Sequence, residues 1–134
     1  MDKENKLILI VDDDPDFLEI LSNKLKNQGF NVETANNGKE ALEKLEHLQP
    51  DFIILDVMMP EIDGIDTALE LTKRFNLKAL KFIFLTNYGE ENWPEEVSLK
   101  IDEGFAKQIG AITYLRKHIP IEEIIKTIEK LLKE

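Results

Sequence analysis

The chain has 134 residues, a length that suits one domain with its own hydrophobic core, and we expect residues 1–134 to form that single domain. It contains no cysteine, which excludes disulfides and thiolate metal sites, and a formal net charge of −10 argues against direct nucleic-acid binding. The sequence has no apolar run of membrane-spanning length and no signal-peptide pattern at its start, so we expect no membrane association and a cytoplasmic location.

The first predicted strand is the continuous apolar run at residues 7–11, which an acidic stretch follows. Continuous apolar runs bounded by breakers are typical of strands that are buried on both faces of a sheet. Asp14 followed by Pro15 then predicts a helix start, with the acid as N-cap and proline at the first helical position. We expect this helix to end near Gly29.

The next segment alternates in polarity where the first strand does not. Residues 31–35 have this alternation, which favours an edge strand with one solvated face. Asn37 and Gly38 turn the chain into a second predicted helix, which Pro50 closes. The apolar residues of this helix are Ala41, Leu42, Leu45 and Leu48.

Two more continuous apolar runs predict two more buried strands. Residues 52–55 lead directly into Asp56, and residues 82–85 lead directly into Thr86. A weaker, half-exposed strand is expected at residues 112–116. The remaining helices are predicted after Gly64, from Glu95 to Gly110, and from Pro120 onward.

Strand followed by helix, five times over, predicts an α/β protein with a parallel sheet covered on both faces. The three continuous runs belong at the centre of the sheet, and the two weaker strands belong at its edges. The strand order 2-1-3-4-5 satisfies both conditions, and it is the flavodoxin-like doubly wound order. We therefore expect a five-stranded sheet and five helices in three layers, with the first and last helices on one face.

Acidic residues follow two strands that this order makes neighbours. Asp12 and Asp13 leave the first strand, and Asp56 leaves the third. Adjacent strands lie about 4.8 Å apart, so the three carboxylates should converge at the switch point where such sheets bind ligands. Carboxylates at such short distances repel one another unless a cation binds between them. A site whose ligands are all oxygen atoms selects a hard cation such as Mg²⁺.

A hydroxyl and a lysine are expected beside these acids. Thr86 follows the fourth strand, and Lys117 follows the fifth. An acid cluster, a hydroxyl and a positive charge around one carboxylate suit a phosphoryl group, with Asp56 as the nucleophile. The sequence therefore favours phosphoryl transfer that depends on positioning and electrostatics.

At these residues the chain resembles the receiver domain of bacterial two-component response regulators. The resemblance runs from about Lys6 to Leu132, and four pieces carry it in order. They are the segment at residues 8–14, the segment at residues 55–60 with Asp63 and Gly64, then Thr86, then Lys117.

The resemblance implies a signalling switch whose only chemistry is its own phosphorylation and dephosphorylation, not an enzyme. Asp56 would accept a phosphoryl group from a phosphohistidine on a sensor histidine kinase or a histidine phosphotransfer protein. Asp13, Asp56 and the Met58 backbone carbonyl would bind Mg²⁺ directly, and Asp12 would hold a metal-bound water.

The resemblance also assigns the residues around the phosphoryl group. Lys117, the Thr86 hydroxyl and the Asn87 backbone would bind it, and Tyr114 would swing inward as Thr86 moves. That coupling would change a protein-interaction surface.

The chain departs from the family's pattern in three places. His118 stands where the family has proline, Asn87 stands where it has a small residue, and the interval from Thr86 to Lys117 is longer than usual. These departures leave open an interaction module with the same fold that is not phosphorylated. A haloacid-dehalogenase-like phosphohydrolase using Asp12 and Asp14 is a weaker alternative, and a flavin carrier is the weakest.

Overall fold

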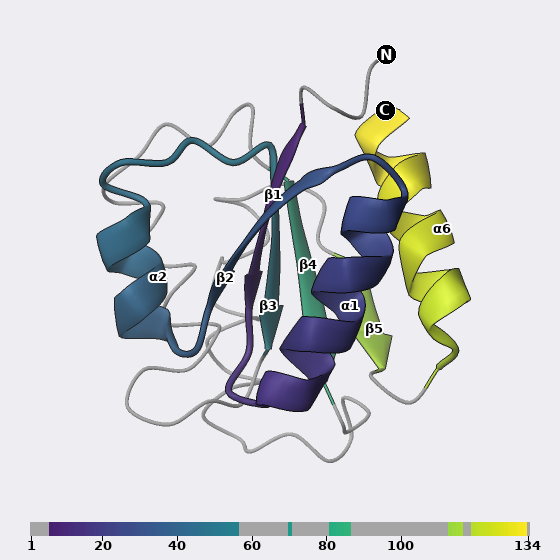
Figure 1. Ribbon diagram of the computed structural model, residues 1–134, viewed down its shortest axis with the longest axis horizontal. Helices are drawn as coiled ribbons and strands as arrows, with labels where there is room; N and C mark the ends of the chain where they lie inside the picture. Colours follow the sequence, from purple (N-terminus) through teal and green to yellow (C-terminus); the bar gives the residue numbers. More distant parts are fainter. Residues whose placement is uncertain (1–5, 57–69, 71–80, 87–112, 117–118, 134) are drawn as a thin grey trace.

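The computed structural model describes residues 6–56, 70, 81–86, 113–116 and 119–133, and the structural statements below concern these residues. They form a five-stranded sheet with helices against it (Figure 1). The elements are β1 (Leu7–Val11), α1 (Pro15–Asn27), β2 (Asn31–Ala35), α2 (Gly38–Lys44), β3 (Phe52–Asp56), β4 (Lys81–Thr86), β5 (Thr113–Arg116) and α6 (Ile121–Lys133).

The strand order is β2-β1-β3-β4-β5, and every neighbouring pair is parallel. The predicted order is therefore confirmed, and its physical basis is visible in the burial of the strands. All five residues of β3 and four of the five in β1 are buried, whereas β2 alternates between exposed and buried positions. A central strand packs on both faces, and an edge strand exposes one of them.

Helices cover both faces of the sheet. Figure 1 shows α1 and α6 side by side on one face and α2 on the other. A hydrophobic core lies under α1 and α6, where alternate strand residues meet the apolar stripes of the two helices. Its strand and loop members are Ile8, Ile10, Phe30, Val32, Phe52, Ile54, Ile83 and Leu85, and its helix members are Leu18, Leu21, Leu25, Ile124, Ile125 and Ile128.

The expected placement of the first and last helices on a common face is confirmed. The two helices expected after Gly64 and after Glu95 lie outside the described residues. No described helix combines the length and the apolar character needed to cross a bilayer.

Both predicted ends of α1 are confirmed. The Asp14 carboxylate accepts hydrogen bonds from the Asp16 and Phe17 backbone N–H groups, at 3.0 and 3.3 Å, which satisfies two of the helix's unpaired donors. At the other end Gly29 has φ of 100°, a left-handed value that glycine adopts without a steric penalty. The Gly29 and Phe30 N–H groups bond back to the Lys26 and Leu25 carbonyls, so the chain leaves the helix in a Schellman turn.

Helix α2 is shorter than the sequence suggested. It ends at Lys44, with Leu45 as C-cap, and the prediction that it carries Leu48 and continues to Pro50 was wrong. The chain tightens after Lys44, because the His47 N–H bonds to the carbonyl three residues back.

A pair of hydrogen bonds at the start of β3 sets the register that the site depends on. The Leu7 N–H donates to the Asp51 carboxylate at 2.9 Å, and the Asp51 N–H donates to the Leu7 carbonyl at 2.8 Å. The register that follows pairs Val11 with Leu55 at the far end of the two strands. The next residue is an aspartate in both cases: Asp12 directly follows β1, and Asp56 is the last residue of β3.

Candidate functional site: an acidic cluster at the ends of β1 and β3

Three carboxylates meet where β1 and β3 end. One oxygen each from Asp12, Asp13 and Asp56 lies within 4.8 Å of the others. The pairing of Val11 with Leu55 places Asp12 opposite Asp56, since parallel strands advance together. The predicted convergence of these three acids is therefore confirmed.

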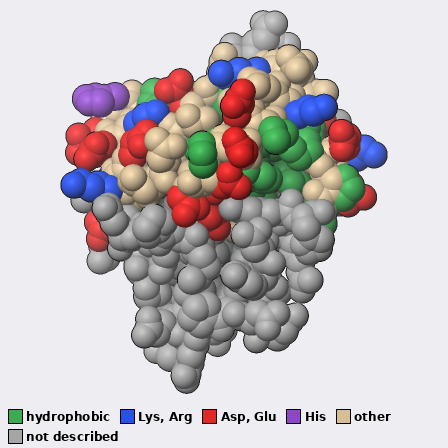
Figure 2. Space-filling view, turned by 60° about the horizontal axis from the view of Figure 1, so that its bottom comes forward, with side chains coloured by type: hydrophobic (Ala, Val, Ile, Leu, Met, Phe, Trp, Pro, Cys, Tyr) green, Lys and Arg blue, Asp and Glu red, His purple; other side chains and the backbone are tan. Residues whose placement is uncertain are grey.

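The three carboxylates differ in their access to solvent. Asp12 is 1% exposed and Asp56 is 5% exposed, whereas Asp13 is an exposed residue. Figure 2 turns this end of the molecule toward the viewer and shows acidic side chains gathered near the border of the described surface. The cluster thus has two buried carboxylates and a third, that of Asp13, at the surface.

The backbone holds Asp12 in place from two directions. Its N–H donates to the Ala35 carbonyl at the end of β2, at 3.1 Å. Its carboxylate accepts a hydrogen bond from the Asp14 N–H at 2.9 Å, which closes the turn between β1 and α1. The buried carboxylate is therefore fixed by the two segments that flank the end of β1.

Asp14 does not belong to this cluster. Its side chain is exposed and caps α1, and it is not among the three residues whose oxygens meet. The interpretation of Asp14 as a helix cap is confirmed, and the acidic stretch after β1 divides into two site residues and one structural residue.

The register also orders the strand ends on the other side of Asp56. Asp56 pairs with Leu85, so Thr86 stands one residue further along at the end of β4. Thr86 in turn pairs with Arg116, the last residue of β5, so Lys117 comes directly after that strand. Tyr114 lies within β5. The side chains of Thr86 and Tyr114, and all of Met58, Asn87, Lys117 and His118, lie outside the described residues, and their predicted roles stay predictions.

The donor set of the acidic cluster suits a hard divalent cation. Mg²⁺ takes six oxygen ligands at about 2.0–2.1 Å, which places neighbouring ligands about 3 Å apart and opposed ligands about 4 Å apart. The three carboxylate oxygens lie within 4.8 Å of one another, so small side-chain rotations bring them to such spacings. They form an acidic triad of the kind that binds Mg²⁺.

Comparison with known proteins places this architecture in a family. The model of the response regulator receiver domain matches residues 8–129, which contain the acidic cluster, β2 to β5 and all of β1 except Leu7. The chain belongs to the response regulator receiver domain family. Receiver domains of this family are signalling modules and not conventional enzymes.

Curated relatives of this receiver domain are longer proteins. The transcriptional regulatory protein CpxR homolog of Haemophilus influenzae is 39% identical over 126 residues, which are 94% of this chain and 50% of the relative. The alkaline phosphatase synthesis transcriptional regulatory protein PhoP of Bacillus subtilis is 34% identical over 131 residues, 96% of this chain and 49% of the relative. The chain spans about half the length of these relatives.

Solved receiver structures match the fold over nearly the whole chain. The chemotaxis protein CheY4 of Vibrio cholerae has a TM-score of 0.76 at 30% identity, covering 93% of this chain and 97% of CheY4. The response regulator TrrA of Thermotoga maritima, in complex with Mg²⁺ and BeF, has a TM-score of 0.74 at 32% identity, covering 94% of this chain and 98% of TrrA.

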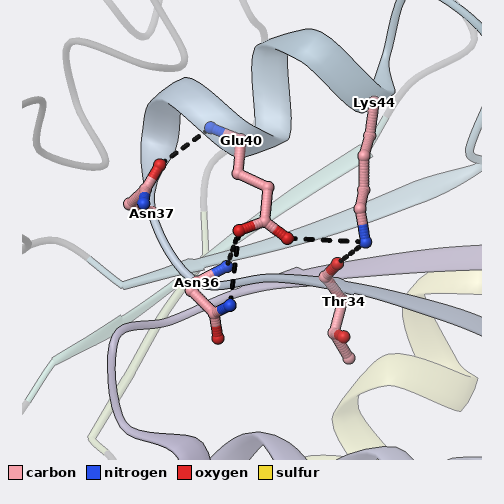
Figure 3. Close-up of polar contacts among 5 residues, drawn as sticks. All are labelled: Thr34, Asn36, Asn37, Glu40 and Lys44. Carbon is pink, nitrogen blue, oxygen red and sulfur yellow. Dashed lines mark hydrogen bonds and ion pairs between the residues drawn. The ribbon is translucent and has the colours of Figure 1, made fainter.

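The structure of this receiver domain adds a polar network that the sequence analysis did not anticipate. It lies at the connection between β2 and α2 and joins Glu40 and Lys44 to Thr34, Asn36 and Asn37 (Figure 3). Part of it has a sequence signal, because an asparagine N-cap followed three residues later by glutamate is typical of a capping box. The contact from Lys44 back to β2 has no such signal.

Proposed function

We propose that this receiver domain accepts a phosphoryl group on Asp56 in a Mg²⁺-dependent reaction, and that the modification switches a protein-interaction surface. The donor is a phosphohistidine on a sensor histidine kinase or a histidine phosphotransfer protein. The observation that carries the proposal is the meeting of the Asp12, Asp13 and Asp56 carboxylates at one end of the sheet. In a chain of this family, that arrangement supports a cation site in which one of the ligands, the Asp56 carboxylate, is also the nucleophile.

Asp56 suits the acceptor role because of where it stands. It is the last residue of β3, and all five residues of that strand are buried, so its backbone is held rigidly. In the reaction an Asp56 oxygen attacks phosphorus and forms a P–O bond. The P–N bond to the donor imidazole breaks, and its electron pair stays on the ring nitrogen, which takes a proton from water.

The other two acids hold the cation in this proposal. Asp13 and Asp56 bind Mg²⁺ directly together with the Met58 backbone carbonyl, and Asp12 holds a metal-bound water. A bound Mg²⁺ neutralises the carboxylates and the phosphoryl oxygens, which otherwise repel one another. The TrrA structure in complex with Mg²⁺ and BeF supports this choice of ion.

Residues at the ends of β4 and β5 complete the proposed site. The Thr86 hydroxyl, the Asn87 backbone and the Lys117 ammonium bind the phosphoryl group, and Tyr114 changes position together with Thr86. Support comes from the register, which puts Thr86 at the end of β4, the neighbour of β3, and pairs it with Arg116 at the end of β5. Charge on Asp56 then alters the surface formed around β5 and its neighbouring helices.

We also propose that residues 1–134 form one receiver domain with five helices, two of them in the segments after Gly64 and Glu95. The coverage of the solved receiver structures supports this, since they match 93–94% of the chain. The family and the charge of −10 support a cytoplasmic module whose contacts are with proteins and not with nucleic acid.

Treatment with a small phosphodonor tests the proposed acceptor. Incubation with acetyl phosphate and Mg²⁺ should add one phosphoryl group to the intact mass of the protein. Asp56→Asn should abolish the gain, because the amide lacks the nucleophilic oxygen. The matched control is Asp14→Asn, which makes the same change outside the cluster and keeps a good N-cap residue.

An unmodified wild-type mass, or an equal gain in Asp56→Asn, would contradict the proposal and favour an interaction module that is not phosphorylated. The phosphohydrolase alternative has less support from the geometry. It needs Asp12 and Asp14 at one site, and the Asp14 side chain is committed to capping α1. Steady turnover of a phosphomonoester that Asp12→Asn abolishes would revive it.

A further inference from the structure

We propose that Glu40 and Lys44 of α2 are positioning residues for the acidic cluster, acting through the end of β2. They hold the two backbone units on either side of Ala35, and Ala35 accepts the hydrogen bond from the Asp12 N–H. The inference rests on the proposed function, because it assigns these two residues to the geometry of the proposed metal site.

Lys44 holds the residue before Ala35. Its ammonium donates a hydrogen bond to the Thr34 carbonyl in β2, and it pairs with a Glu40 carboxylate oxygen at 3.6 Å (Figure 3). The contact spans from the last turn of α2 back to the strand that precedes the helix. It therefore ties the end of β2 to the helix on the face of the sheet opposite α1.

Glu40 holds the residue after Ala35. The second oxygen of its carboxylate accepts hydrogen bonds from both the backbone N–H and the side-chain amide of Asn36, each at 3.3 Å. The Glu40 N–H in turn donates to the Asn37 side chain at 2.8 Å, which caps α2. One carboxylate thus joins the start of the helix to the segment that leaves β2.

Ala35 links this network to the cluster. It is 1% exposed, pairs with Val11 in the sheet, and its carbonyl accepts the Asp12 N–H at 3.1 Å. β2 lies at the edge of the described sheet, so none of the described strands fixes its outer side, and the α2 side chains do so instead. A shift of the Ala35 carbonyl would move the Asp12 backbone and with it the buried carboxylate.

The Glu40–Lys44 ion pair is half-exposed, which distinguishes a role in positioning Asp12 from a role in stabilising the fold. The Glu40 and Lys44 side chains are 34% and 35% exposed, and ion pairs this accessible contribute little to folding. Their removal should therefore disturb the position of Asp12 more clearly than it disturbs the stability of the whole domain.

Nuclear magnetic resonance of the metal-free protein tests the hydrogen bond itself. In Lys44→Met we expect a weaker through-bond coupling between the Asp12 nitrogen and the Ala35 carbonyl carbon. Exchange of the Asp12 amide proton should become at least about tenfold faster, because this bond no longer has a fixed acceptor. Lys39→Met is the matched control, since Lys39 is an exposed lysine of the same helix, and it should change neither quantity.

Calorimetric titration with Mg²⁺ tests the consequence for the site. Partners that orient metal ligands affect metal affinity strongly, and for this more remote pair we expect at least about threefold weaker binding in Lys44→Met. Glu40→Gln should weaken binding in the same direction. The two variants change the net charge in opposite senses, so a purely electrostatic effect on a cation would have opposite signs. Lys44→Arg should restore most of the affinity, because it keeps a cationic donor.

Unchanged Asp12 coupling, Asp12 exchange and Mg²⁺ affinity in both Lys44→Met and Glu40→Gln would overturn the inference, even if both variants unfold more easily. Opposite shifts in affinity with an undisturbed Asp12 amide would overturn it as well. A wild-type protein that binds no Mg²⁺ would contradict the proposed function instead, and the metal-free amide measurements would still decide whether Glu40 and Lys44 position Asp12.

Discussion

Three consecutive aspartates after β1 have three different environments. Asp12 is buried and held by backbone hydrogen bonds, Asp13 is exposed beside it, and Asp14 caps α1. The difference follows from the change of direction at the strand end, where each successive residue points to a new part of the molecule. Composition alone cannot separate these acids, because all three offer the same functional group.

Substitution of the neighbouring aspartates should separate their roles. Asp13→Asn removes one of the three carboxylates of the cluster, and we expect Mg²⁺ affinity to fall by about tenfold or more. Asp14→Asn removes the same charge one residue further on but keeps the cap, so the affinity should stay within about twofold of wild type. Calorimetry on both variants measures the difference. Equal losses would mean that only the summed charge near the site matters.

Burial patterns of individual strands determine the arrangement of the elements. β1 and β3 have continuous apolar sequences and lie at the centre, and the alternating β2 lies at an edge. Helix α1 was equally predictable from the sequence, since Asp14 and Gly29 mark its two ends and its apolar stripe packs on the sheet. These elements could be predicted from the sequence because helix caps and apolar periodicity are signals that lie within a few consecutive residues.

Adjacent residues of α1 should show how much of the stability resides in that stripe. Leu21 is fully buried in the core, and Leu21→Ala should cost about 2–5 kcal/mol of unfolding free energy through lost packing and the cavity left behind. Ile20, the next residue, is 50% exposed, and Ile20→Ala should change the unfolding free energy by less than about 0.5 kcal/mol. Urea unfolding followed by circular dichroism gives both values. A comparable cost at the two positions would argue against this packing of α1.

Features that depend on contacts between elements were harder to predict. The bond from Lys44 to the Thr34 carbonyl depends on how α2 lies against β2. The sequence reports periodicity along one element, and it does not report the distance from a side chain to a neighbouring strand. For the site, the three acids were predictable because topology alone brings strand ends together.

At the scale of the whole molecule, folding brings like charges together. Asp12 and Asp56 are far apart in the chain, and the parallel register of β1 and β3 makes them neighbours in a protein that already carries a net charge of −10. Their repulsion opposes the folded state unless a cation is present. A ligand that binds only the folded protein stabilises it in proportion to its concentration above the Kd.

Thermal unfolding with and without Mg²⁺ should reveal this linkage. At about ten times its Kd, Mg²⁺ should add about 1.4 kcal/mol to the unfolding free energy. For a domain of this size that corresponds to a rise in Tm of about 5 °C. Excess chelator should reverse the rise, and Asp13→Asn should lose most of it while Leu21→Ala, destabilised elsewhere, should keep it. A Tm that Mg²⁺ does not change would mean that the cluster tolerates its charge without an ion.

The site of modification tests the central claim most directly. Protein treated with acetyl phosphate, with and without Mg²⁺, is reduced with borohydride, which converts an aspartyl phosphate to homoserine, and its peptides are sequenced by mass spectrometry. We predict homoserine at position 56 alone, and only in the sample that contained Mg²⁺. Modification at Asp12 or Asp13, or equal modification of Asp56 without the ion, would contradict the account.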